Sequence, residues 1–354
     1  MPISAVDTIS LALEHTKRQL FHPFRFGQWT RLAFVGLLAG ELGSGGKPNF
    51  NPGQGGSAHP PGLGFPKIDP AILVALIGTI AITALILFIV FLYISSVMRF
   101  VLFDSILKKE CHIREGWSRR QGIAWPYFLW QIGFAFLTFA VAIILFGIPA
   151  LFAYTAGWFN HAKEHIAGLV IGGIIVVGLF LVFCVVVAVV HVMTKDFVIP
   201  QMALEGIGPI EAWRRLLPTL QAEKSGYAAY VGMKILLAIG AGILVTIATL
   251  ILALLVAVPV VGVVVAAVIA GKAAAVTWNV FTITAAVVAG CILLAIFLYL
   301  VAMISVPIIV FFPAYSIYFF AARYRALSVV LYPPPAATVT NPLPPDLPPA
   351  PAPA

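Results

Sequence analysis

Charged side chains are scarce in this chain of 354 residues, of which only 10% are Asp, Glu, Lys or Arg. Apolar residues make up 61% of the chain, against about 45–50% in soluble domains. A soluble core cannot bury that much apolar surface, so part of it must face lipid. The composition excludes an ordinary soluble enzyme and predicts an all-α integral membrane protein.

Cysteine is also scarce, with three residues at Cys111, Cys184 and Cys291. Three thiols cannot all pair with one another, and the last two lie inside apolar runs. The sequence therefore predicts reduced thiols and excludes a disulfide framework. Residues 1–23 contain charged side chains and no compact apolar run, so no cleavable signal peptide is expected.

Catalytic motifs are absent from the sequence. There is no Walker loop, no dinucleotide fingerprint and no G-x-S-x-G. We therefore predict no enzymatic activity and no cofactor. The net charge of +8 comes from residues that flank apolar runs, not from a basic stripe interleaved with aromatics. This pattern favours membrane phospholipid as a partner and excludes nucleic acid.

Long uncharged runs dominate what is present. They cover residues 70–98, 121–162, 166–194, 235–271 and 273–322. A membrane-spanning helix needs about 20 residues, so each run can hold one. A sixth, weaker candidate covers residues 29–43, where Arg31 and Glu41 shorten the apolar stretch. The sequence thus predicts six transmembrane helices.

The distribution of basic residues predicts the orientation of these helices. With six spans and a cytoplasmic N-terminus, most of the 21 Lys and Arg residues fall on the cytoplasmic side. The outer side receives only Lys47, Lys67, Lys163 and Lys272. The positive-inside rule therefore predicts a multi-pass protein of the cytoplasmic membrane with both termini inside.

Composition divides the chain into two parts. Residues 1–330 form the predicted six-helix membrane domain, which includes a Gly- and Pro-rich outer loop at 43–69. Residues 331–354 form a Pro-rich cytoplasmic tail that we expect to be disordered. The tail carries the PxxP spacing within residues 342–349, so it could instead dock a protein partner.

An internal repeat relates residues 99–121 to residues 196–218. The matching residues, at an offset of 97, are Phe100, Val101 and Ile113 with Phe197, Val198 and Ile210. A third segment similar to these two occurs at 309–327. The N-terminal part is a diverged copy, with a Ser4–Asp7 capping box and helical spacing at Ile9, Leu13, Thr16 and Leu20. The sequence predicts three helical hairpins joined by cytoplasmic amphipathic connector helices.

Each of the two clear connectors combines a Trp with two Arg residues. These candidates for lipid or interface contact are Trp117, Arg119, Arg120, Trp213, Arg214 and Arg215. The connector at 209–220 begins with Pro, which suits a first helical turn. Its predicted apolar face comprises Ile210, Trp213, Leu217 and Leu220. That face can lie at the headgroup level with Arg reaching phosphate, or pack on the ends of the bundle.

The segment "FVIPQMALEGIGPIEAWRRLLPTL" at 197–220 resembles a pattern in six-span bacterial and archaeal membrane proteins. The likeness is carried by Val198, Pro200, Glu211, Ala212 and Trp213. These proteins are the membrane domain of glycerophosphoryl diester phosphodiesterase and related domains of unknown function. The resemblance implies a membrane fold and no established activity, because no stretch here is polar and long enough for the catalytic barrel.

Ionisable residues within spans are expensive and therefore candidates for function. Three of them are Glu41, His191 and Lys234. Glu41 and Lys234 could simply reach the membrane surface, and His191 could be a neutral, hydrogen-bonded ring. No carboxylate pair at mid-membrane is evident from the sequence.

The segment "HAKEH" at 161–165 has the H-x-x-E-H spacing of inverted zinc proteases. His161 and His165 could bind one metal ion with Glu164 as a base, and a third ligand would have to come from Glu41, His59 or Asp69. The alternative is a solvated polar turn without metal.

Taken together, the sequence predicts a non-catalytic membrane bundle that interacts with lipid or acts as a scaffold. The alternative is a transporter or permease for a small or lipidic solute. Internal repetition and Gly- or Pro-interrupted helices at 238–245 and 257–265 favour it. A membrane metalloenzyme at the His161–His165 turn is a remote alternative.

Overall fold

The computed structural model describes residues 4–41, 70–158, 165–273 and 280–332. Secondary structure within these ranges is helical, without strands. The elements are α1 (Asp7–Phe21), α2 (Phe26–Leu38), α3 (Pro70–Lys108), α4 (Ile113–Thr155), α5 (Ile166–Met193), η2 (Thr194–Val198), α6 (Ile199–Glu205), α7 (Pro209–Ala222), α8 (Lys224–Ala273), α9 (Val280–Ala321) and α10 (Arg325–Leu331). The whole predicted outer loop at 43–69 and the tail from residue 333 onward lie outside the described residues.

Five helical segments are long and apolar enough to cross a membrane. They are Leu73–Lys108, Ile113–Thr155, Ile166–Glu205, Lys224–Ala266 and Thr284–Ala321. Each contains one of the five uncharged runs or most of it. The prediction of an α-helical protein is confirmed, and five of its helices have the length and composition of membrane spans.

The sixth predicted span corresponds to α2. This helix has 13 residues, so it is about 20 Å long. The hydrocarbon core of a bilayer is about 30 Å thick. Helix α2 is therefore not among the five long apolar helices, and a sixth crossing stays a prediction.

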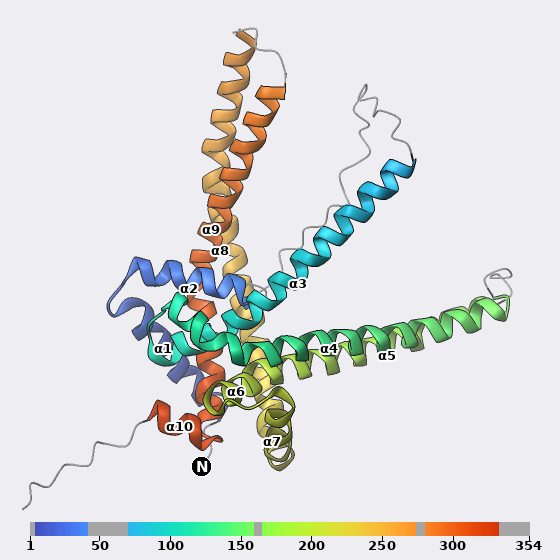
Figure 1. The fold of residues 1–354 in the computed structure, drawn as a ribbon, viewed down its shortest axis with the longest axis vertical. Helices are drawn as coiled ribbons and strands as arrows, with labels where there is room; N and C mark the ends of the chain where they lie inside the picture. The colour runs from blue at the N-terminus through green and yellow to red at the C-terminus, as the bar shows by residue number, and fades with distance from the viewer. Residues whose placement is uncertain (1–3, 42–69, 159–164, 274–279, 333–354) are drawn as a thin grey trace, which may run out of the picture.

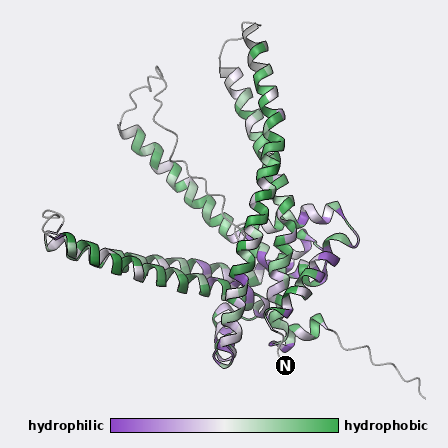
Figure 2. Ribbon diagram, turned by 180° about the vertical axis from the view of Figure 1, so that it is seen from behind, coloured by the Kyte–Doolittle hydropathy of each residue, from purple (hydrophilic) through white to green (hydrophobic). Residues whose placement is uncertain are grey.

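The molecule consists of a hub and three arms (Figure 1). The hub comprises α1, α2, η2, α6, α7 and α10 with the neighbouring ends of the long helices. The arms are α3, the α4–α5 pair and the α8–α9 pair, and they diverge from the hub. Figure 2 shows that the arms are apolar along their length, whereas polar residues concentrate at the hub. Because apolar side chains on the arms are exposed, the arms require lipid around them.

The hydrophobic core lies in the hub and is rich in aromatic rings. Tyr230 stacks on Tyr315 with ring centroids 5.2 Å apart, and it contacts Phe319 at 4.5 Å. Phe197 packs against Tyr230 at 5.1 Å, and Phe100 packs edge-on against Tyr127. Large, fully buried side chains thus hold η2 together with α8 and α9, and α3 together with α4.

Helix α1 begins with the predicted Ser4–Asp7 contact, in which the Asp7 amide donates to Ser4 Oγ at 3.2 Å. Its buried face agrees with the predicted one at Thr16 and Leu20 but differs from it elsewhere. Leu13 is exposed, and the buried residues are Thr8, Ala12, His15, Thr16, Gln19 and Leu20. Polar side chains lie on the inner face because they hydrogen-bond to backbone carbonyls of α3. For example, Gln19 Nε2 donates to Ser105 O. A hydrophobic pattern cannot identify such positions.

All three cysteines are free thiols, as the sequence predicts. Cys111 is buried in the hub, and burial raises the pKa of its thiol. Cys184 and Cys291 are exposed on the arms.

Candidate functional site

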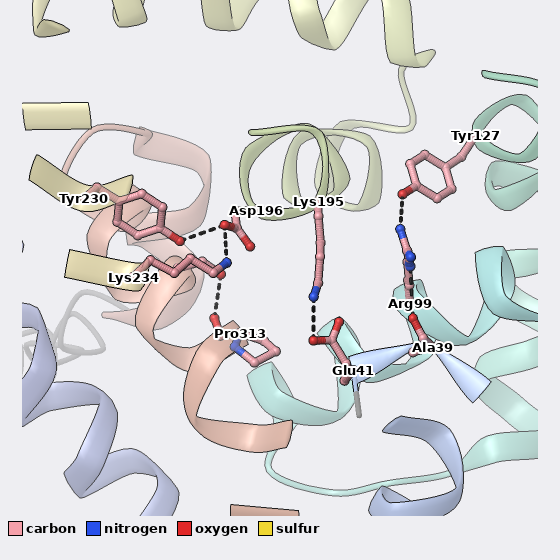
Figure 3. A network of polar contacts seen from close by, with 10 residues as sticks. Ala39, Glu41, Arg99, Tyr127, Lys195, Asp196, Tyr230, Lys234 and Pro313 are labelled. Atoms are coloured by element: carbon pink, nitrogen blue, oxygen red, sulfur yellow. Dashed lines mark hydrogen bonds and ion pairs between the residues drawn. The ribbon is translucent and has the colours of Figure 1, made fainter. Parts of the chain in front are cut away.

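Five ionisable residues line one small cavity of about 30 Å³ at the centre of the hub. This charged cluster consists of Glu41, Arg99, Lys195, Asp196 and Lys234. Its members come from the segment just after α2, from α3, from η2 and from α8. Figure 3 shows how these side chains converge from helices that are far apart in the sequence.

The π-helical turn η2 supplies two neighbouring members of the cluster. The Ile199 amide bonds to Thr194 O, which gives the wide turn of a π-helix. Lys195 Nζ donates to Glu41 Oε2 at 2.5 Å, whereas Asp196 faces α8. Such turns occur frequently at functional sites. Here the turn directs adjacent charges of opposite sign to different partners.

Asp196 joins η2 to α8. Tyr230 Oη donates to Asp196 Oδ2 at 2.9 Å, and Lys234 Nζ forms an ion pair with the same oxygen. All three side chains are buried or nearly so. Lys234 is therefore paired inside the hub. This contradicts the alternative from the sequence in which Lys234 simply reaches the membrane surface.

Arg99 connects α2, α3 and α4. Its Nε donates to Ala39 O at 3.1 Å, and its Nη1 donates to Tyr127 Oη at 2.7 Å. Gln131 Nε2 also donates to Tyr127 Oη, and Ser96 Oγ donates to the Gln131 side chain. These contacts continue the charged cluster into the α3–α4 interface.

The charged cluster contains three cations and two carboxylates, so it carries an excess of one positive charge. Burying a charge without a partner is costly. Ionisable groups at membrane-spanning helices mark functional sites by default. The arrangement can stabilise one anionic group near its excess positive charge.

The structure brings together two of the three intramembrane candidates. Glu41 and Lys234 both belong to the charged cluster. His191 lies on α5, one turn before Lys195, and its ring is exposed. Arg99, Lys195 and Asp196 belong to the site but were not predicted as site residues. Their position in the sequence could have identified two of them, because Arg99 and Lys195 directly follow the uncharged runs 70–98 and 166–194.

The first connector does not present both Arg residues to lipid. Arg120 binds both Asp104 oxygens, at 2.7 and 2.6 Å, and also donates to Ala203 O at 2.6 Å. Its side chain is only 13% exposed. Arg120 thus holds α3, α4 and α6 together, contrary to the predicted lipid contact. Arg119 is exposed beside Glu115, and Trp117 packs edge-on against Tyr93.

The second connector is helix α7, which begins at Pro209 as predicted. Its buried face consists of Pro209, Ala212 and Leu216, so the alternative that the predicted apolar face packs on the ends of the bundle is wrong for Ile210 and Leu217. Ile210 and Leu217 are exposed. Trp213 is half-buried, and its Nε1 has no hydrogen-bond partner within the described residues.

The Arg residues of α7 differ in their surroundings. Arg215 forms ion pairs with Glu205 and Glu211. The Arg214 side chain is 77% exposed, and its Nη1 lies 3.5 Å from Glu211 Oε2. An exposed line along α7 comprises Ile210, Arg214, Leu217 and Gln221 and is called the α7 stripe below.

Comparison with protein families identifies the group of related sequences. One family model matches residues 3–330. The chain belongs to a family of unknown function, DUF7544. No curated protein and no solved structure matches it. The DUF7544 match covers nearly all of the predicted membrane domain and gives no link to glycerophosphoryl diester phosphodiesterase.

In this DUF7544 member, only His165 of the predicted metal-binding segment 161–165 is described, and it directly precedes α5. His161 and Glu164 are outside the described residues, and His165 stacks on Trp158 with centroids 5.8 Å apart. Glu41 cannot complete such a site, because it binds Lys195 beyond the opposite end of α5. That helix has 28 residues, which is about 40 Å. Within the described ranges, no group of three His, Cys, Asp or Glu residues could hold a metal ion.

Proposed function

We propose that this DUF7544 member is a multi-pass protein of the cytoplasmic membrane that binds phospholipid and acts as a non-catalytic scaffold. The hub lies at the cytoplasmic face with both chain termini, and the three arms enter the bilayer. Helices α1, α7 and α10 at the hub carry Arg18, Arg214 and Arg325, which supports this orientation by the positive-inside rule.

The α7 stripe is the observation that carries the proposal. It places the exposed cation of Arg214 between the exposed apolar side chains Ile210 and Leu217. A helix of this kind lies in the interface, with its apolar side chains among acyl chains and its Arg at the phosphates. Each basic residue near an anionic surface contributes about 1 kcal/mol to binding.

Fluorescence quenching by lipid tests this placement. A bimane label is attached at Leu217→Cys in protein whose Cys184 and Cys291 are replaced by Ala, and the protein is reconstituted with brominated phospholipid. We expect strong quenching, greater with phosphatidylglycerol than with phosphatidylcholine. Arg214→Ala should remove the difference between the two lipids, because it removes the cation at the headgroups.

The matched control is a label at Ala222→Cys, which is exposed on the same helix but lies about 120° away from Ile210 around its axis. That label should be quenched little. Equal quenching at both positions, or no quenching at Leu217→Cys, would contradict an interfacial α7.

The proposal includes the internal repeat. Arg99 and Asp196 occupy the same position of the repeat, and each hydrogen-bonds a Tyr of the following long helix. The next residue in each copy, Phe100 or Phe197, packs on that same Tyr. This parallel supports two related hairpins and leaves the distant resemblance to phosphodiesterase membrane domains as a prediction.

A transporter is the second candidate function, and the charged cluster favours it. Glu41 and Asp196 line the same cavity, so two carboxylates meet in the hub, at the cytoplasmic end of the arms and not at mid-membrane. Proton flux into proteoliposomes, measured with an enclosed pH-sensitive dye, tests this function. Flux that is lost in Asp196→Asn but kept in Glu115→Gln, an exposed control, would favour transport over the scaffold.

A further inference from the structure

A groove runs along the α4–α5 arm next to the hub. Its volume is about 680 Å³, within the range of about 300–1,000 Å³ typical of small-molecule sites. Its walls are apolar and include small side chains of α4, Ala135 and Ala142, opposite Phe180 and Cys184 of α5. His191 lies at its hub end.

The length of the groove fits one leaflet of a bilayer. From Phe180 to His191, α5 rises by about 16 Å. Half of the hydrocarbon core is about 15 Å thick. A lipid of the leaflet on the hub side can therefore place one acyl chain along the groove with its headgroup at His191.

The hub end of the groove is polar, and the charged cluster lies beyond it in the hub. The His191 ring makes no hydrogen bond within the described residues, although it lies on a membrane-spanning helix. Lys195 follows one turn later, and the His191 ring feels the charges of Arg99 and Lys195 and, with opposite sign, those of Asp196 and Glu41. On α4, Gln131 lies one turn from the groove residue Ala135 and contacts Tyr127, the partner of Arg99.

We propose that this groove binds one acyl chain of an anionic phospholipid from the cytoplasmic leaflet, with His191 donating a hydrogen bond to the phosphate. The excess positive charge of the charged cluster attracts the headgroup, and the apolar walls hold the chain. The lipid also gives the otherwise unpartnered imidazole an acceptor in a region where water is scarce. This site is separate from the α7 stripe and extends the proposed interaction with lipid.

Photocrosslinking tests the site in the full-length protein. Phosphatidylcholine nanodiscs carry phosphatidylglycerol with a diazirine in the middle of one acyl chain, and labelled peptides are identified by mass spectrometry. We expect crosslinks within 134–142 and 180–191. Ala142→Trp should abolish them by filling the groove. Ile144→Trp, an exposed position on the other side of α4, should leave them unchanged.

A separate variant tests the proposed contact between His191 and the lipid phosphate. His191→Leu keeps an apolar groove but removes the donor, so labelling by phosphatidylglycerol should fall about tenfold, the effect of losing one hydrogen bond to a charged group. Diazirine-labelled phosphatidylcholine should label the unaltered protein at that lower level. His191→Gln, which retains a donor, should preserve part of the preference for phosphatidylglycerol.

Three outcomes would overturn the assignment. They are labelling spread equally over all faces of α4, labelling insensitive to Ala142→Trp, and stronger labelling by a diazirine fatty acid than by the phospholipid. Quenching of the Leu217→Cys label is measured in the same variants. If it persists while the groove is unlabelled, the groove proposal fails and the interfacial α7 stands.

Discussion

Lys195 donates a hydrogen bond to Glu41 and so ties the end of α2 to the turn that follows α5. The Glu41 side chain is only 2% exposed, and Lys195 is largely buried. A buried ion pair has a large cost if one partner is removed, because the other charge is left behind. The pair therefore fixes where α2 ends on the hub.

Glu41→Gln should lower the free energy of unfolding by about 3–5 kcal/mol, because it leaves the Lys195 ammonium buried without its carboxylate. Lys195→Met should have a similar effect for the converse reason. Combining the two should cost clearly less than the sum of the single variants. Denaturant titration in detergent, followed by circular dichroism, measures all three. Additive losses would show that the two residues act independently.

Asp104→Asn should destabilise the protein by about 3–5 kcal/mol, because Arg120 loses a two-oxygen partner in a nearly buried site. The control is Glu115→Gln, which removes the partner of the neighbouring Arg119 at an exposed position. That change should stay within about 0.5 kcal/mol. The same unfolding measurement compares them, and equal effects would mean that Arg120 is not a structural contact.

Gly36→Ala should destabilise the docking of α2 on α9. A Cβ at this position would lie 2.7 Å from Ile309 Cδ1, and Ile309 is itself buried. Overpacking of this kind costs about 1–3 kcal/mol. Gly27→Ala on the same helix meets open space and should change stability by less than about 1 kcal/mol. Thermal unfolding of both variants decides whether the close approach matters.

His15 should make stability depend on pH. Burial lowers the pKa of this ring, with a further contribution from the charge of Lys109. The carbonyl of Ile106 can only accept, so Nε2 donates to it and Nδ1 accepts from Tyr318 Oη. The folded protein thus favours the neutral ring, whereas the unfolded chain takes up a proton near pH 6.5.

The free energy of unfolding should accordingly fall as the pH drops below about 6.5, and level off below the pKa of the folded protein. His15→Gln should be less stable at pH 7.5 but should lose less stability on acidification. Unfolding curves at pH 7.5 and 5.5 measure both. A His15→Gln variant with the same pH dependence as the unaltered protein would assign the effect to other groups.

The long helices were predictable because each corresponds to a continuous uncharged apolar run. Such a run can be identified in the sequence without knowledge of the fold. The start of α7 at Pro209 was predictable for the same reason. Its buried face was not, since Ala212 and Leu216 pack on the hub while the larger Ile210 stays exposed. Apolar size predicts burial poorly where a helix can also face lipid.

The charged cluster was only partly predictable. Glu41 and Lys234 stand out because they interrupt or border apolar segments. Their grouping depends on tertiary contacts such as Lys195 with Glu41, 154 residues apart. No pattern of spacing encodes that contact. Asp196 was overlooked because it sits beside Lys195, where an exposed pair of opposite charges is the ordinary interpretation.

The wide turn at η2 also sets the rotation of α6 about the helix axis relative to α5. A π-turn accommodates one residue more than an α-turn, and one residue corresponds to about 100° of rotation. Deleting a single residue between Thr194 and Val198 would turn α6 by that angle relative to α5. The Pro200 and Met202 side chains would then leave the core, while the groove on α5 would keep its direction. The lipid-facing arm and the packed hub are therefore kept in phase by one inserted residue.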